Sequence, residues 1–280
     1  PPRSPAPIRQ GVGGAVTILA RRHRLDPRAR QPEGLKSCIN LSARGGLQRG
    51  TRVADQILVE GSACAEPRGL NSGPQHIAAW REVMIICRTP FRLSFFGGGT
   101  DYPGWYLKHG GSVLSATIDK YCYLSCRYLP PFFEHRYRVV YSKIESTRTI
   151  AEIEHPAVRA ALEFLDIDRG VEIHHDGDLP ARSGMGSSST FAVGLLHALH
   201  ALCGRMPSRR QLALEAIHVE QEMLAETVGS QDQTAAAYGG LNHILFLQNG
   251  EIVVRPVTIP ESRLRELDAH LMLLYTCIKR

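Results

Sequence analysis

The sequence predicts an α+β fold, in which strands gather into a sheet and helices pack against it. The strand patterns come in clusters and do not alternate strictly with helix patterns, which favours α+β over a doubly wound sheet. No internal repeat is visible along the chain. Its 280 residues are enough for one large domain or two small ones.

The first 81 residues differ in composition from the rest. Residues 1–81 have a net charge of +8, whereas residues 82–280 have a net charge of −2. The first segment is rich in Pro, Gly and Arg and holds no helical or strand period. It is predicted to be a disordered basic tail, or alternatively not to be native protein sequence. Because the basic excess belongs to this segment, no nucleic-acid partner is expected.

The globular pattern begins at Met84, which is also a candidate start of the natural protein. Pro156 suits the first position of a helix that runs to about residue 165. Alternation of polar and apolar residues, or β-branched content, predicts the first strands. These strands are expected at 84–88, 112–118, 120–129, 136–142 and 171–175.

The second half of the chain is predicted to hold further helices and a hairpin. An apolar helix over 191–203 ends near Gly204, and Ser208 with Gln211 forms a capping box for the next helix. The pair Asn249 and Gly250 predicts a turn between strands at 242–247 and 251–258. One more strand is expected at 270–276.

Residues 179–190 are the most informative stretch, because glycines and hydroxyls directly precede a long apolar helix. The first N–H groups of a helix have no partner within it, and they point outward with the positive end of the helix dipole. Such an end can seat a phosphate, and a nearby hydroxyl can hold Mg²⁺ on that phosphate. The alternative is a serine-rich cap on an ordinary helix. Neither a Walker loop nor the nucleophile elbow of hydrolases is present.

Two carboxylates follow this stretch. Asp232 lies after a glycine turn and opens a small-residue helix, so it is either a catalytic acid or base or a helix cap. Glu220 falls on the apolar face of the helix that Ser208 opens. A buried acid needs a cation partner, which is either Mg²⁺ or an Arg or Lys side chain.

A second glycine-rich segment lies near the start of the globular part. Gly97, Gly98 and Gly99 permit close backbone approach to a ligand, and Asp101 just beyond could bind sugar hydroxyls. A flexible turn between strands is the alternative. Arg92 stands a few residues earlier.

Three motifs follow one another along the chain: Arg92 with the glycine-rich segment up to Asp101, the stretch 179–190, and the segment around Asp232. Together they resemble the motifs of the GHMP small-molecule kinases. The resemblance implies a two-layer α+β domain like that of a ribosomal protein, with a left-handed βαβ crossover. It also implies ATP and Mg²⁺ as cofactors, Asp232 and Arg92 as catalytic residues, and Ser188 and Glu220 as metal ligands. The implied ATP-binding residues are Pro180, Gly184, Met185, Gly186, Ser187, Ser188 and Ser189, and the implied substrate-binding residues are Gly98, Gly99, Asp101 and Arg182.

Within that family the chain looks most like the bacterial D-glycero-α-D-manno-heptose 7-phosphate kinases. The implied reaction is ATP-dependent phosphorylation of the anomeric hydroxyl to give the 1,7-bisphosphate. Gly98 and Gly99 stand where galactokinase has Glu-His, which argues against galactose. The alternatives are a fucokinase-like or galactokinase-like enzyme, and a non-catalytic nucleotide-binding or sugar-binding fragment. The resemblance covers residues 84–280, so the second domain of the family is expected to be largely missing.

The remaining expectations concern location and partners. Seven cysteines without ladder spacing indicate free thiols in a reducing cytoplasm. No apolar stretch reaches membrane-spanning length, so no membrane partner is expected. The expected partner is a sugar or sugar phosphate, and the sequence leaves the oligomeric state open.

Overall fold

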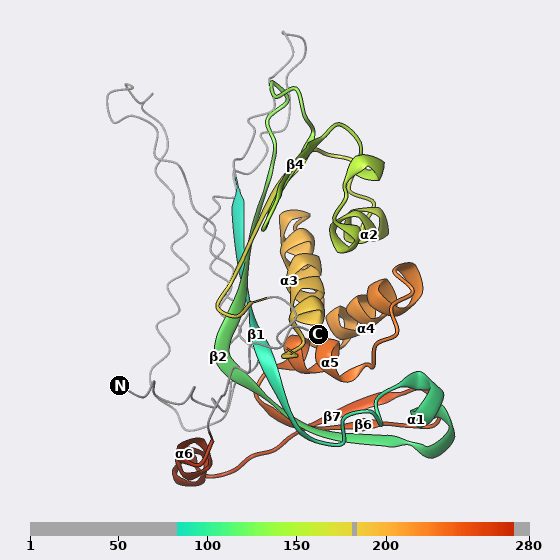
Figure 1. The fold of residues 1–280 in the computed structure, drawn as a ribbon, viewed down its shortest axis with the longest axis vertical. Helices are drawn as coiled ribbons and strands as arrows, with labels where there is room; N and C mark the ends of the chain where they lie inside the picture. The colour runs from blue at the N-terminus through green and yellow to red at the C-terminus, as the bar shows by residue number, and fades with distance from the viewer. Residues whose placement is uncertain (1–82, 181–183, 272–280) are drawn as a thin grey trace, which may run out of the picture.

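The computed structural model describes residues 83–180 and 184–271. The predicted tail at 1–81, Arg182 and residues 272–276 of the last predicted strand lie outside the described residues. Within the described ranges, the chain forms a seven-stranded sheet with helices gathered beside it (Figure 1).

Two long strands form the backbone of the sheet. β1 (Met84–Phe96) pairs antiparallel with β2 (Gly111–Tyr128) along most of its length. The two strands predicted at 112–118 and 120–129 are therefore one continuous strand. The register shifts twice, between Pro90 and Arg92 and between Ser94 and Phe96.

The other edge of β2 is shared between two strands. Its first part pairs with β6 (Leu241–Phe246) and its last part with β5 (Val171–Gly177). The strand order is β4-β3-β5-β2-β6-β7, with β1 on the remaining edge of β2. β4 (Ile144–Thr147) and β7 (Ile252–Pro256) end this order, and β3 (Tyr137–Val140) lies between β4 and β5.

One pair of strands differs from the others. β3 and β5 run parallel, whereas the other paired strands run antiparallel. The chain between β3 and β5 passes through β4, a short 3₁₀ helix (Ile150–Glu152) and α2 (Pro156–Phe164). This mixed sheet confirms the predicted α+β class, and the handedness of the crossover stays a prediction.

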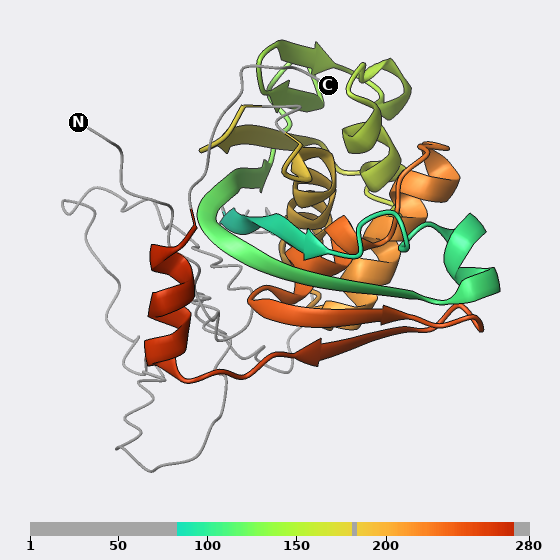
Figure 2. The same ribbon diagram turned by 60° about the horizontal axis from the view of Figure 1, so that its bottom comes forward.

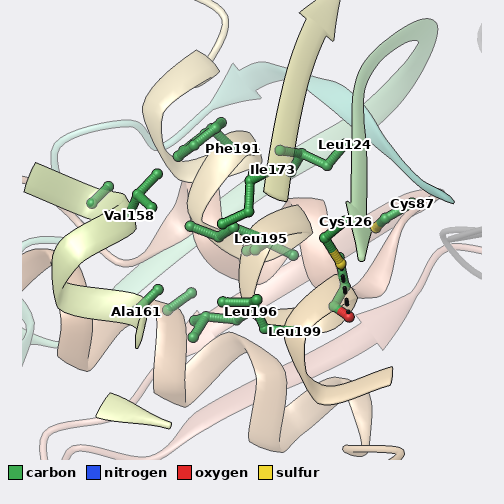
Figure 3. Packing of buried hydrophobic residues seen from close by; sticks show 14 of the residues in the cluster. Cys87, Leu124, Cys126, Val158, Ala161, Ile173, Phe191, Leu195, Leu196 and Leu199 are labelled. Atoms are coloured by element: carbon green, nitrogen blue, oxygen red, sulfur yellow. Dashed lines mark hydrogen bonds between the residues drawn. The ribbon is translucent and has the colours of Figure 1, made fainter. Parts of the chain in front are cut away.

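The main core lies between the sheet and α3 (Ser187–Leu202). Figure 3 shows Leu195, Leu196 and Leu199 of α3 packed among residues of α2 and of the sheet. The helix approaches β1 closely, because a Cβ at Gly194 would lie 2.6 Å from the Thr89 hydroxyl. The glycine-rich segment that precedes α3 lies beside β1, where Arg92 Nη1 donates to the Gly184 carbonyl at 3.2 Å.

Several local signals read from the sequence are confirmed. The Ser208 hydroxyl accepts a hydrogen bond from the Gln211 backbone N–H (3.1 Å) at the start of α4 (Arg209–His218). Gly204 after α3 and Gly250 in the β6–β7 turn both have positive φ. α5 (Gln231–Tyr238) follows the Gly229 segment as the small-residue pattern predicted.

Other elements were not predicted from the sequence. These are β4, the 3₁₀ helix, α1 (Pro103–His109), a π-helical turn (Val219–Met223) and α6 (Glu261–Ala269). Leu264 of α6 packs against Ala116 and Leu241, on the side of the sheet away from α3 (Figures 1 and 2). His270 ends α6, so the strand predicted to begin there is wrong at that residue. In the described ranges, no helix combines the length and apolarity needed to cross a membrane.

Candidate active site

The glycine-rich segment and the start of α5 meet at the amino end of α3. Gly186 is the N-cap residue of α3, with φ +71°, and no side chain caps the helix there. A Cβ at Gly186 would lie 2.9 Å from Asp232 Oδ2. Glycine is therefore needed for its backbone conformation and for the close approach of Asp232.

The helix begins at Ser187, four residues before the predicted start, so the three serines form its first turn. Within the helix, the first N–H groups have no acceptor, and the helix dipole makes this end favourable for an anion. Ser188, Gly184 and Pro180 are exposed, whereas Ser189 is buried and Met185 packs partly against the core. This arrangement suits a phosphate group at the segment 184–189.

Arg92 joins the three motifs. Its Nε donates to Asp232 Oδ1 at 2.7 Å and its Nη2 donates to Asp232 Oδ2 at 2.8 Å. Its Nη1 donates to the Gly184 carbonyl at 3.2 Å. The two side chains are largely shielded, with 13% and 22% of their surfaces exposed. A bidentate pair of this kind fixes the orientation of the carboxylate, and each carboxylate oxygen keeps further acceptor capacity.

Glu220 lies beneath this turn of α3, with 1% of its surface exposed. Its Oε2 accepts from Ser189 Oγ at 2.7 Å and from Gln233 Nε2. Burial raises the pKa of Glu220, while hydrogen bonds from Ser189, Gln233 and Ser188 act in the opposite direction. The prediction that Glu220 faces the buried side is confirmed, although it sits in a π-helical turn that the sequence pattern did not reveal.

The other carboxylate oxygen, Glu220 Oε1, is buried without a hydrogen-bond partner in the described part of the chain. A buried carboxylate oxygen without a donor is unfavourable unless a cation approaches it. The nearby Ser188 hydroxyl supplies a second oxygen, and Mg²⁺ prefers oxygen ligands together with substrate phosphates and water. These residues therefore fit Mg²⁺. The described residues contain no group of three or more His, Cys, Asp or Glu side chains that could hold a metal by themselves.

The predicted substrate segment adjoins the same place. A Cβ at Gly98 would lie 3.6 Å from Gln231 Nε2, at the start of α5. Asp101 has 1% of its surface exposed and accepts hydrogen bonds from the Gly99 and Gln231 backbone N–H groups. Both oxygens of the Asp101 carboxylate thus have protein donors. The role of Asp101 as a sugar ligand stays a prediction.

Ser94, Gln231 and Gln233 were not predicted from the sequence to belong to the site. Ser94 donates to Gln231 Oε1 at 2.8 Å, and the Gln231 amide donates to Asp101 Oδ1 at 3.2 Å. Gln233 is fully buried against Glu220. For Gln231 and Gln233 the available signal was their position on either side of Asp232, because a polar side chain in a small-residue helix needs a partner. Ser94 in β1 carried no such signal.

Comparison with known proteins shows which family this fold is similar to. A family model described as the GHMP kinases N terminal domain matches residues 151–240. One relative is the D-glycero-alpha-D-manno-heptose 7-phosphate kinase of Campylobacter jejuni. It is 30% identical over 207 residues, and the match covers 70% of this chain and 60% of the relative. The chain contains a GHMP kinase N-terminal domain.

Two further relatives have lower identity to this chain. The galactokinase of Chloroflexus aurantiacus is 27% identical over 198 residues, covering 66% of this chain and 48% of the relative. A solved structure of a D-glycero-D-manno-heptose 1-phosphate kinase from Bacteriodes thetaiotaomicron is 27% identical with a TM-score of 0.60. That match covers 65% of this chain and 62% of the solved one. The chain thus spans less than two thirds of the length of each of these relatives.

Proposed function

We propose that this chain is the nucleotide-binding and catalytic part of an ATP-dependent sugar kinase. The observation that carries the proposal is the bidentate Arg92–Asp232 pair beside Gly186, at the amino end of α3. Phosphoryl transfer needs a phosphate seat, a positive charge beside it and a group that orients the acceptor hydroxyl. The segment 184–189, Arg92 and Asp232 would supply these three in that order.

Each residue has a defined task in the proposed reaction. The first N–H groups of α3 would bind the ATP phosphates. An oxygen of Asp232 would accept the proton of the attacking hydroxyl, whose oxygen bonds to the γ-phosphorus as the bond to ADP breaks. Arg92 would orient Asp232 and face the negative charge on the transferring group. Ser188 and Glu220 would hold Mg²⁺, which supplies positive charge that neutralises the phosphates when it is bound.

The proposed acceptor is the anomeric hydroxyl of D-glycero-α-D-manno-heptose 7-phosphate, giving the 1,7-bisphosphate. The heptose relatives support a heptose phosphate, although their names place the phosphate at C7 in one and C1 in the other. Gly98 and Gly99 in the substrate segment also favour a sugar other than galactose. A cytoplasmic location is part of the proposal, because ATP and reduced thiols are both found there.

The test is ADP release by the 280-residue chain with Mg-ATP. The sugar panel contains heptose 7-phosphate, heptose 1-phosphate, fucose and galactose. We expect turnover with heptose 7-phosphate and a loss of at least about 1,000-fold in Asp232→Asn, which keeps the shape of the side chain.

The outcomes separate the alternatives. Turnover with fucose or galactose alone would make the chain a fucokinase-like or galactokinase-like enzyme. Binding of ATP without turnover on any sugar, by a folded sample, would instead support a nucleotide-binding or sugar-binding fragment.

A further inference from the structure

Gln233 is a buried amide of which only one end has a partner. It is the third residue of α5, and none of its surface is exposed. Its Nε2 donates to Glu220 Oε2, whereas its Oε1 is buried without a hydrogen-bond partner in the described part of the chain. An amide oxygen buried in this way is unfavourable, and an apolar side chain of the same size would avoid that cost. Stability alone therefore does not account for a glutamine at this position.

The Glu220 carboxylate is held from two helices through a single oxygen. Its Oε2 accepts from Ser189 Oγ of α3 at 2.7 Å and from Gln233 Nε2 of α5. Ser189 is 4% exposed and Glu220 is 1% exposed, so water has little access to these hydrogen bonds. Two donors on Oε2 fix the orientation of the carboxylate, and Oε1 is the oxygen that remains for another partner.

The chemical type of the two donors matters as much as their place. A hydroxyl and an amide are neutral, so they orient the carboxylate and leave its negative charge intact. An arginine or lysine in their place would neutralise the charge that attracts a divalent cation. Hydrogen bonds from neutral groups are thus suited to a carboxylate that binds a metal.

We propose that Gln233 and the Ser189 hydroxyl are positioning residues for Glu220 as an Mg²⁺ ligand. The inference rests on the proposed function, in which Ser188 and Glu220 hold Mg²⁺. Gln233 and the Ser189 hydroxyl are not ligands themselves, and they act by keeping Glu220 Oε2 in place and Oε1 available. Hydrogen-bond partners of metal ligands are typically worth about 10- to 100-fold in metal affinity.

The first test measures the effect of Mg²⁺ without turnover. The probe is a non-hydrolysable ATP analogue, whose dissociation constant is measured by calorimetry with and without Mg²⁺ in the 280-residue chain. The ratio of the constant without Mg²⁺ to that with Mg²⁺ reports how strongly the metal favours nucleotide binding. In Gln233→Met and in Ser189→Ala we expect this ratio to fall by about 10-fold. The constant without Mg²⁺ should change by less than about 3-fold.

Asn242→Leu is the matched control. Asn242 is 4% exposed, and its Nδ2 donates to the Gly239 carbonyl at 2.7 Å just beyond the other end of α5. The control therefore also removes a buried amide hydrogen bond, and we expect it to keep the ratio of the wild type. Thermal unfolding without Mg²⁺ establishes that each variant is folded. Ser189→Ala removes a single hydroxyl, so it keeps the test decisive if Gln233→Met does not fold.

The second test determines whether Gln233 acts through Glu220. Gln233→Met is combined with Glu220→Gln, in which the carboxylate is absent. We expect the double variant to have the same ratio as Glu220→Gln, because a positioning residue has no effect once the residue it positions is lost. In Gln233→Met alone, kcat at saturating Mg-ATP and heptose 7-phosphate should stay within about 3-fold of the wild type, since the Arg92–Asp232 pair does not include this contact.

Three results would overturn the inference. The first is a wild-type ratio in either Gln233→Met or Ser189→Ala. The second is a lower ratio in the double variant than in Glu220→Gln, which would make Gln233 a metal ligand itself. The third is a kcat at saturating Mg²⁺ that falls by about 10-fold or more in Gln233→Met, which would show that Gln233 acts through its neighbour Asp232.

Failure of the proposed function gives a different pattern. If the wild type and Glu220→Gln have the same ratio, Glu220 is not an Mg²⁺ ligand, and that part of the proposed function fails together with the inference. If Glu220→Gln has a lower ratio than the wild type, while Gln233→Met and Ser189→Ala match the wild type, only the inference fails. A chain that turns over none of the sugars still gives these ratios, because the analogue is not hydrolysed.

Discussion

Two buried glutamates, Glu172 in β5 and Glu220 in the π-helical turn, have different partners in this fold. Glu172 of β5 is met by Arg127 at 2.6 Å, by Arg138 at 3.0 Å and by His174 at 3.0 Å. Glu220 is met by hydroxyl and amide groups, and one of its oxygens has no partner among the described residues. The protein thus supplies cations to one carboxylate and, within the described ranges, pairs the other with neutral groups.

The pKa shifts of the two groups follow from these surroundings. Burial acts to raise the pKa of Glu172, but the hydrogen bonds from His174 and Arg127 outweigh it and lower that pKa. Burial raises the pKa of Glu220, and its hydrogen bonds do not reverse the shift. A buried acid with its own cations serves stability, whereas one without a cation is suited to a cation from outside.

The largest expected effect separates the two glutamates by function. Glu220→Gln should reduce kcat/KM for Mg-ATP by at least about 100-fold, because an amide is a poor Mg²⁺ ligand compared with a carboxylate. Thermal unfolding without Mg²⁺ should occur at the same temperature as in the wild type or higher, since an uncompensated buried charge is removed. Steady-state kinetics and calorimetric unfolding check the two parts. A large loss of stability with unchanged Mg²⁺ dependence would show that Glu220 is structural.

The next effect concerns the arginines. Arg92→Lys should lower kcat by about 100-fold, because lysine cannot make the two parallel hydrogen bonds to Asp232. The matched change Arg127→Lys at the Glu172 cluster should leave kcat within about 2-fold of the wild type, since that cluster is remote from the motifs. Both rates are measured with the substrate that the panel identifies. Equal losses in the two variants would remove the distinction between the two arginines.

A smaller effect is expected on stability at the Glu172 cluster. Glu172→Gln should reduce the free energy of unfolding by about 1 to 2 kcal/mol near pH 7, less than for a fully buried pair, because Arg127 and Arg138 are 35% and 40% exposed. A carboxyl with a lowered native pKa contributes stability above its unfolded pKa, and that contribution is lost as the pH falls through the native pKa. The variant and the wild type should therefore converge in that acidic range. Urea unfolding at pH 7 and at pH 3 tests this, and a constant difference would contradict it.

The smallest effect is expected at Arg138. Arg138→Gln should reduce the free energy of unfolding by about 0.5 kcal/mol or less, because water screens a side chain that is 40% exposed and Arg127 still pairs with Glu172. Urea unfolding in low and high salt measures it. A loss above about 2 kcal/mol would show that the cluster acts as a single unit.

The extent of sequence-based prediction differs between elements. The start of α2 at Pro156, the cap at Ser208 and the β6–β7 turn depend on residues close together in the chain, so the sequence predicted them. The long β2 was divided in two at Asp119, where its register with β1 shifts and where neither β5 nor β6 pairs with it. The strand continues past this point because β1 pairs with β2 on both sides of it. α6 was missed because its apolar face is narrow and is defined by contact with Ala116 and Leu241.

The sequence by itself determined the motifs, the order in which they occur and the α+β class, because local spacing and residue type carry that information. Only the tertiary structure decided which polar groups meet. The pairing of Arg92 with Asp232 joins residues 140 positions apart, and the enclosure of Asp101 by Gly229 and Gln231 joins residues about 130 apart. A sequence pattern shows that a carboxylate is present, but its partners depend on how distant segments pack.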